Sequence, residues 1–106
     1  MTDETRWKHL RDAAFRRDHF RCRECARFGK QVPAERAHHA WPADEFPEFR
    51  WELWNLVSLC KSCHDKMHVR GSRELTDRGR AWMRRCHPPP GSLAEKWEGP
   101  QLGAGR

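Results

Sequence analysis

The 106-residue sequence predicts a small α+β domain that is stapled by a metal ion. Three observations predict this fold class. Helical patterns flank the centre of the chain, short β-like segments occupy the centre, and two Cys-x2-Cys pairs enclose it. A core of this size rarely stabilises a fold alone, so we expect a staple, and the cysteines supply one.

We expect one folded domain over residues 1–86, with its central motif at 22–69 and a flexible tail over 87–106. The tail opens with three consecutive prolines and a glycine, a composition that is typical of linkers. Cys86 stands at the boundary, and the sequence assigns it no role.

The first expected helix runs from Trp7 to Phe20, with Thr2 or Thr5 as its N-cap. Apolar residues recur at three- and four-residue steps between arginines, which is typical of an amphipathic helix. The apolar set is Trp7, Leu10, Ala14 and Phe15.

The centre of the chain predicts two short extended segments that are joined by a loop. Residues 31–41 form the first segment and carry the adjacent His38 and His39. Residues 42–54 are acidic and aromatic, and two prolines restrict them to a loop with a short helical turn. Residues 55–59 form the second extended segment.

Two further helices are expected after this centre. The first covers residues 62–69, and Gly71 marks its end. The second covers residues 75–85, with Thr76 as its N-cap. Its apolar contacts are expected from Leu75, Trp82 and Met83.

The two cysteine pairs predict a structural zinc site. Each pair supplies two thiolates, and four thiolates suit tetrahedral zinc. The ligands would be Cys22, Cys25, Cys60 and Cys63. Two disulfides are the alternative, but a two-residue gap strains such a bridge, and the reducing cytosol disfavours it. Four thiolates leave no open position for water or substrate, so this zinc would be structural.

The net charge of +6 favours an anionic partner, of which nucleic acid is the obvious class. A merely well-charged soluble surface is the alternative. No apolar run approaches the ~18 residues that a membrane span needs, and residues 1–11 are too polar for a signal peptide. We therefore expect a cytoplasmic protein with no membrane partner.

The histidines predict a second metal site. His64 and His68 lie four residues apart on an expected helix, so they face the same side and can share one metal. His38 and His39 would point to opposite faces of an extended segment, so one could join that metal while the other acts as a base. Solvated surface histidines are the alternative for both pairs.

Two segments carry a recognisable pattern: Ala-His-His-Ala-Trp-Pro at 37–42 and Asn-Leu-Val-Ser-Leu-Cys-Lys-Ser-Cys-His at 55–64. Together they resemble the signature of HNH endonucleases, the ββα-metal nucleases. The resemblance covers about residues 6–69, including an opening Trp-x2-Leu-Arg helix that is typical of phage and bacterial members. It implies a β-hairpin followed by a helix, wrapped around one divalent metal.

The resemblance also implies a role for each residue. His39 would be the general base, Asn55 would orient the hairpin and the base, and His64 would be a metal ligand. His38 would be a ligand where many relatives have aspartate, and His68 resembles the second helix histidine of the nuclease colicins. The catalytic ion would be Mn²⁺, Ni²⁺, Zn²⁺, Co²⁺ or Mg²⁺, although an all-imidazole shell disfavours tight Mg²⁺ binding.

The implied activity is metal-dependent hydrolysis of DNA phosphodiester bonds, by nicking or double-strand cleavage, with 5′-phosphate and 3′-hydroxyl products. Arginines on the flanking helices would contact phosphates, so we expect weak sequence preference. The expected DNA-binding residues are Arg16, Arg17, Arg21, Arg23, Arg70 and Arg73.

Two other interpretations stay open. A non-catalytic zinc module that binds nucleic acid or a protein explains the cysteines and the charge, but it leaves the histidines and Asn55 unrelated. An accessory nuclease of phage DNA packaging would act with a large terminase subunit, and a mobile-element or defence nuclease fits the same residues. The sequence indicates no oligomeric state.

Overall fold

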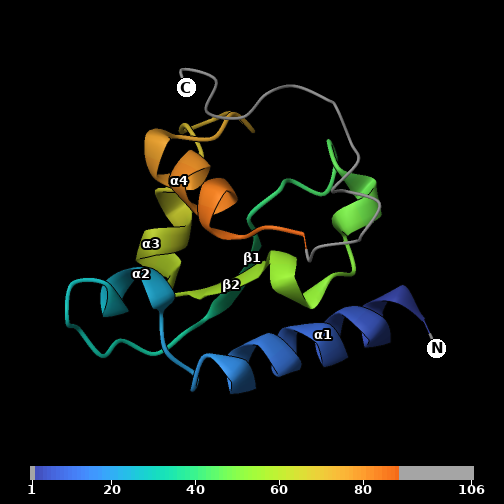
Figure 1. Cartoon of the computed structure of the whole chain (residues 1–106), viewed down its shortest axis with the longest axis horizontal. Coiled ribbons are helices and arrows are strands. Elements are labelled where there is room, and N and C mark those ends of the chain that lie inside the picture. Colours follow the sequence, from blue (N-terminus) through green and yellow to red (C-terminus); the bar gives the residue numbers. More distant parts are fainter. Residues whose placement is uncertain (1, 89–106) are drawn as a thin grey trace.

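The computed structural model describes residues 2–88 (Figure 1). Its elements are α1 (Asp3–Arg17), α2 (Arg23–Ala26), β1 (Arg36–His39), η1 (Pro47–Phe49), η2 (Leu53–Asn55), β2 (Leu56–Leu59), α3 (Lys61–Asp65) and α4 (Asp77–Arg85). This is the small α+β arrangement that the sequence predicts. The expected tail lies outside the described residues from position 89 onward, so the domain boundary stays a prediction.

The two strands form an antiparallel hairpin at the centre of the molecule. His38 lies opposite Val57, and His39 lies opposite Leu56. Helix α1 covers one side of the hairpin, while α3 and α4 lie on the other (Figure 1). All four residues of β2 are buried, because helices cover both of its faces. The hairpin therefore presents one histidine to each side.

Helix α1 differs from the expected helix at both ends. It begins at Asp3, with Thr2 as N-cap, because the Thr2 hydroxyl accepts a hydrogen bond of 3.1 Å from the Thr5 amide. It ends at Arg17 rather than Phe20. The φ angles of His19 and Phe20 are 57° and 60°, which no right-handed helix accommodates. The cap at Thr2 is confirmed, and the predicted end was wrong.

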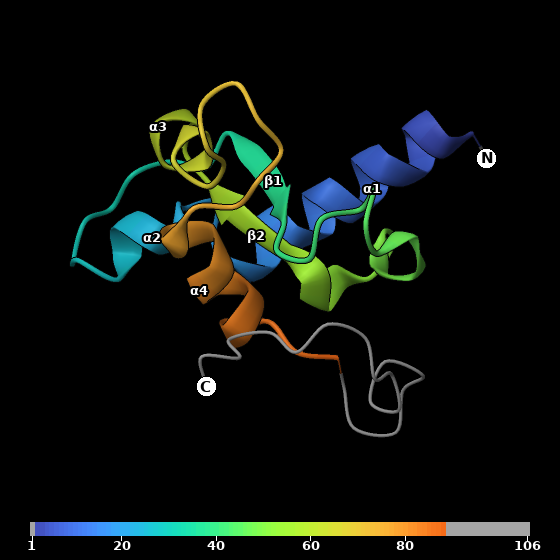
Figure 2. The same ribbon diagram turned by 90° about the horizontal axis from the view of Figure 1, so that it is seen from above.

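The expected helix over 62–69 is also shorter in the structure. Helix α3 ends at Asp65, and the chain beyond it is extended and pairs with the approach to α4. The Val69 amide donates to the Glu74 carbonyl at 2.7 Å, and His68 forms an isolated bridge with Leu75. This connection lies beside β1 (Figure 2). His64 and His68 are therefore not on one helix, which corrects the prediction.

Helix α4 matches its prediction closely. Thr76 is the N-cap, and its hydroxyl accepts a hydrogen bond of 3.2 Å from the Gly79 amide. The expected apolar contacts are all buried: Leu75, Trp82 and Met83. They join a core that includes Leu59 and Met67.

The loop between the strands contributes an aromatic cluster to this core. Trp41 contacts Phe46 and Phe49 edge-on, with ring centroids 5.0 and 5.6 Å apart. Its indole Nε1 donates a hydrogen bond of 2.7 Å to the Cys86 carbonyl, which fixes the end of α4. In the part of the chain that the structure describes, no helix has the length and apolar character for crossing a membrane.

Candidate metal centres and active site

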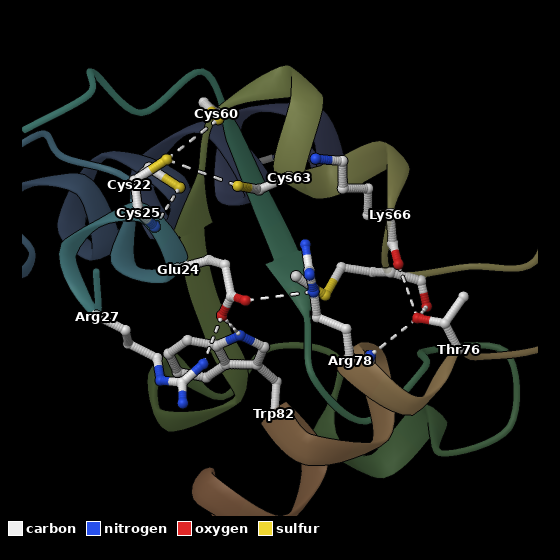
Figure 3. A network of polar contacts seen from close by, with 12 residues as sticks. Cys22, Glu24, Cys25, Arg27, Cys60, Cys63, Lys66, Thr76, Arg78 and Trp82 are labelled. Carbon is white, nitrogen blue, oxygen red and sulfur yellow. Dashed lines mark hydrogen bonds and ion pairs between the residues drawn. The ribbon is translucent and has the colours of Figure 1, made fainter. Parts of the chain in front are cut away.

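The four cysteines form one compact cluster. Two lie at the start of α2 and two at the start of α3, and their Sγ atoms all lie within 4.8 Å of one another (Figure 3). The Sγ of Cys25 is 3.9 Å from that of Cys60 and 3.7 Å from that of Cys63. Tetrahedral zinc with Zn–S bonds of about 2.3 Å separates its sulfurs by about 3.8 Å. The cluster is compatible with structural zinc, as the sequence predicts.

The thiols of this cluster need a cation to ionise together. Burial raises the pKa of the Cys63 thiol, and the neighbouring sulfurs raise it further. A bound divalent cation reverses this effect, because it binds the thiolate form. Cys86 is buried outside the cluster, and none of the five cysteines forms a disulfide.

Three histidines converge on the other side of α3. His38 comes from β1, His64 from α3 and His68 from the extended connection. The ring centroid of His38 lies 5.4 Å from that of His64 and 5.6 Å from that of His68. The His64 and His68 centroids are 6.5 Å apart. Rings that share one metal, with metal–nitrogen bonds of about 2.1 Å, have centroids about 5 Å apart. Two of the three spacings are close to this value, but among the described residues only the four cysteines bring all their ligand atoms within 4.8 Å of one another.

The burial and the lowered pKa of His38 suit an imidazole that binds a metal cation. His38 is 2% exposed, and its buried Nε2 has no hydrogen-bond partner within residues 2–88. Burial lowers the pKa of His38 to about 3, and the nearby His64 and His68 contribute to this shift. Burial and His68 also lower the pKa of His64. Burial therefore favours the neutral form of His38 and His64, and neutral imidazole is the form that binds metals.

His39 points to the opposite face of β1. Its Nε2 lies 3.0 Å from the Arg50 carbonyl oxygen, and its ring lies 5.2 Å from that of Trp7. A carbonyl can only accept, so Nε2 carries the proton and Nδ1 is the unprotonated nitrogen of the neutral ring. Burial lowers the pKa of His39, which the Arg50 carbonyl only partly offsets. Burial therefore favours the neutral ring of His39, in which Nδ1 is the basic nitrogen.

Asn55 uses its side-chain amide inside the protein. It is fully buried, and its Oδ1 accepts a hydrogen bond of 2.7 Å from the Trp41 amide. Its Nδ2 donates to the carbonyls of Trp41 and Phe49 at 3.0 and 3.1 Å. The amide thus ties the chain that leaves β1 to the turn before β2, and so fixes where the hairpin presents its histidines.

A protein-family model described as HNH endonuclease matches residues 22–70. By this match, residues 22–70 are similar to an HNH domain. This HNH domain contains both cysteine pairs, the hairpin and α3, whereas α1 and α4 lie outside it. No curated protein and no solved structure matches the chain. The family predicted from the sequence is therefore confirmed for this segment.

An open cavity of about 550 Å³ adjoins two of the histidines of the HNH domain. It is lined by His64, Asp65, His68, Val69, Arg70, Gly71 and Ser72. Arg70 is exposed there. The cavity gives solvent and an anionic ligand access to the histidine cluster from the side of the α3–α4 connection.

The six arginines predicted to bind DNA fall into two groups, according to whether a carboxylate of the chain pairs with them. Arg17, Arg23 and Arg73 each pair with a carboxylate of the same chain, and the Arg73–Asp44 pair is exposed. Arg17 also donates to two backbone carbonyls of the hairpin region, at 2.9 and 2.6 Å. Within residues 2–88, no carboxylate partner is found for Arg16, Arg21 and Arg70.

Two contacts of the site were missed from the sequence. The Arg50 carbonyl is a backbone group in an irregular loop, and no residue pattern signals its direction. Trp7 was recognised only as an apolar residue of the first helix. Its contact with His39 depends on how α1 crosses the hairpin.

Proposed function

We propose that this chain is a divalent-metal-dependent endonuclease that hydrolyses phosphodiester bonds in DNA. One observation carries the proposal. The buried Nε2 of His38 has no hydrogen-bond partner among the described residues, and the His38 ring lies beside two further imidazoles, while the Nε2 of the adjacent His39 is bonded to the Arg50 carbonyl. These features lie within an HNH domain. The proposed ligand and the proposed base are consecutive residues of β1, which face opposite sides of the hairpin and lie beside different cavities.

His38, His64 and His68 are the proposed ligands of the catalytic metal. A metal bound there supplies a Lewis acid for the phosphate and stabilises the leaving oxygen. Burial lowers the pKa of His38 to about 3, so no proton competes for this ring at physiological pH. The cavity beside His64 and His68 is open to the substrate.

His39 is the proposed general base. Its Nδ1 takes a proton from the attacking water, while Nε2 keeps its hydrogen bond to the Arg50 carbonyl. That hydrogen bond holds the tautomer in which Nδ1 is basic, and it remains available when the ring becomes charged. Asn55 acts through the backbone, because its amide is occupied within the protein.

Arg16, Arg21 and Arg70 are the proposed phosphate contacts, because they have no carboxylate partner among the described residues. The net charge of +6 would draw DNA toward the site before specific contacts form. Phosphate contacts do not read bases, so cleavage is expected to depend weakly on sequence and strongly on salt.

The test is cleavage of supercoiled plasmid by zinc-loaded protein with Mn²⁺, Ni²⁺, Co²⁺, Zn²⁺ or Mg²⁺. We expect nicked or linear products with the wild type, and a loss of at least about 100-fold with His39→Ala. The exposed His9→Ala is the matched control and should cleave normally. Re-ligation of the nicks would identify 5′-phosphate and 3′-hydroxyl ends.

Absence of cleavage with every metal, from folded protein, would overturn the proposal in favour of a non-catalytic zinc module. That alternative is not favoured, because it gives no reason for a buried, unpartnered imidazole beside two others. Neither the fold nor the comparisons support a terminase partner.

A further inference from the structure

His39 is held by two contacts on the face of the hairpin that α1 covers. The Arg50 carbonyl accepts a hydrogen bond from Nε2 at 3.0 Å. The indole of Trp7 lies against the ring at a centroid distance of 5.2 Å and an angle of 32°. Trp7 belongs to α1, which lies outside the HNH domain at residues 22–70. The element that touches His39 thus lies outside the segment that the family model matches, although the resemblance of the sequence extends to it.

Helix α1 also braces the residue next to the accepting carbonyl. The guanidinium of Arg6 lies 4.2 Å from the ring centroid of Trp51, and that of Arg50 lies 5.4 Å from it. A guanidinium at this distance from an indole face is attracted to it. Consecutive residues of α1 therefore contact both the His39 ring and the segment that supplies its hydrogen-bond acceptor.

A single hydrogen bond does not fix an imidazole completely. The χ2 torsion of histidine is broad, so the ring can swing about the bonded nitrogen while the bond persists. An indole against one face removes this freedom, because ring contacts at 4.5 to 7 Å have preferred geometries. The indole face also favours the charged ring that forms after proton transfer. The restricted orientation and the favoured charged ring both concern the proton transfer in which His39 is proposed to act.

We propose that Trp7 is a positioning residue for His39, which makes α1 a part of the active site. The proposal rests on the proposed function, in which His39 is the general base. The ring contact of Trp7 is with His39, and the two residues line one pocket together with Arg50 and Trp51. The effect of Trp7 on catalysis therefore passes through His39.

The test compares Trp7→Ala, Trp7→Phe and Trp7→Leu with the exposed His9→Ala on the same helix. All carry the full chain and a complete zinc complement. Trp7→Ala should lower kcat by about 10- to 100-fold with KM changed much less, because a small misplacement of a reacting group has effects of this size. Trp7→Phe should restore most of the rate, and His9→Ala should match the wild type. Trp7→Leu retains apolar volume without a ring and should stay slow, which separates helix packing from ring stacking.

A double-mutant cycle separates positioning from a general structural role. If Trp7 acts through His39, Trp7→Ala should slow the residual cleavage of His39→Ala by less than 2-fold. If the double variant loses activity by the product of the two single-variant losses, the proposal is overturned. A second readout needs no activity: the ring protons of His39 should shift by NMR when the indole ring current is removed. Unmoved resonances with full activity in Trp7→Ala would also overturn it.

The same variants distinguish this failure from failure of the proposed function. If His39→Ala cleaves as fast as the wild type, the general base is wrongly assigned and the role of Trp7 falls with it. If His39→Ala is inactive while Trp7→Ala is fully active, only the positioning role is wrong.

Discussion

Glu24 accepts a hydrogen bond of 2.9 Å from the indole Nε1 of Trp82, and both side chains are buried (Figure 3). Glu24 lies between the first two cysteines, and Trp82 lies in α4. The guanidinium groups of Arg27 and Arg78 flank the carboxylate at 3.3 and 3.4 Å. The contact therefore joins the first cysteine pair to a helix outside the HNH domain.

Loss of this contact should destabilise the fold measurably. Trp82→Phe retains a large aromatic ring but removes the donor from a buried carboxylate, which should lower the free energy of unfolding by about 1–3 kcal/mol. Urea denaturation at a fixed zinc concentration measures this change in the free energy of unfolding. Trp54→Phe is the control, since Trp54 is half-buried and packs on Phe49 without a described indole hydrogen bond. Equal losses in both variants would contradict a specific role for the Glu24 contact.

The two metal sites should separate under mutation. Cys60→Ser removes a ligand of the cysteine cluster and should unfold the domain, because metal binding and folding are coupled in small domains. His64→Ala should stay folded but lose cleavage and the second, exchangeable metal. Circular dichroism and metal analysis measure the two effects. Cys86→Ser is the control for a buried cysteine outside the cluster, and it should retain zinc. Equal melting of Cys60→Ser and His64→Ala would mean that the sites are misassigned.

Asp18 should contribute stability that is lost only in acid. Burial alone raises the pKa of its carboxyl, but hydrogen bonds from Arg17 and from the Ser58 amide outweigh burial and hold the pKa below its ordinary value. A lowered pKa stabilises the fold above the unfolded pKa, about 4, and this contribution disappears as the pH falls through the folded pKa.

Comparison with Asp18→Asn isolates this contribution. The stability difference between wild type and variant should be constant from pH 8 to about 5, and should narrow below about 4. Loss of zinc in acid affects both proteins alike, since both carry the same cysteines. A difference that narrows already between pH 7 and 5 would show that another group is titrating.

Gly79 should resist substitution although it lies inside a helix. Glycine to alanine normally stabilises a helix by about 1 kcal/mol. A Cβ at Gly79 would instead collide with the Met67 carbonyl and the Leu75 side chain. We expect Gly79→Ala to destabilise the protein by about 1–3 kcal/mol in thermal unfolding. The exposed Arg84→Ala on the same helix should change stability by less than about 0.5 kcal/mol, and a stabilised Gly79→Ala would refute the close approach.

Much of the fold was predictable because its signals are local. The cysteine spacing predicts the cluster, and threonine caps mark the starts of α1 and α4. The end of α1 was not predictable from periodicity, because two consecutive residues adopt positive φ angles for tertiary reasons. The end of α3 was missed for a related reason: His68 pairs with Leu75, and this contact competes with one more helical turn.

The histidine site was predicted in composition but not in detail. Alternation along β1 separates His38 from His39, as expected for consecutive strand residues. His68 was expected to approach His64 through helical spacing, whereas an extended connection brings it to His38 instead. The partners of His39 come from α1 and from a backbone carbonyl, and neither follows from a residue pattern.

The pairing of β1 with β2 has a consequence for how this protein tolerates change. Successive strand residues face opposite ways, so a slip of one residue would exchange the surroundings of His38 and His39. A backbone hydrogen bond of 2.8 Å stabilises the register at each end of the hairpin. The Ala40 amide donates to the Asn55 carbonyl at one end, and the Glu35 amide donates to the Leu59 carbonyl at the other. Insertions in the loop between the strands leave these two hydrogen bonds in place. One residue added inside β1 would turn the base inward and the ligand outward, with every side chain of the site still present in the chain.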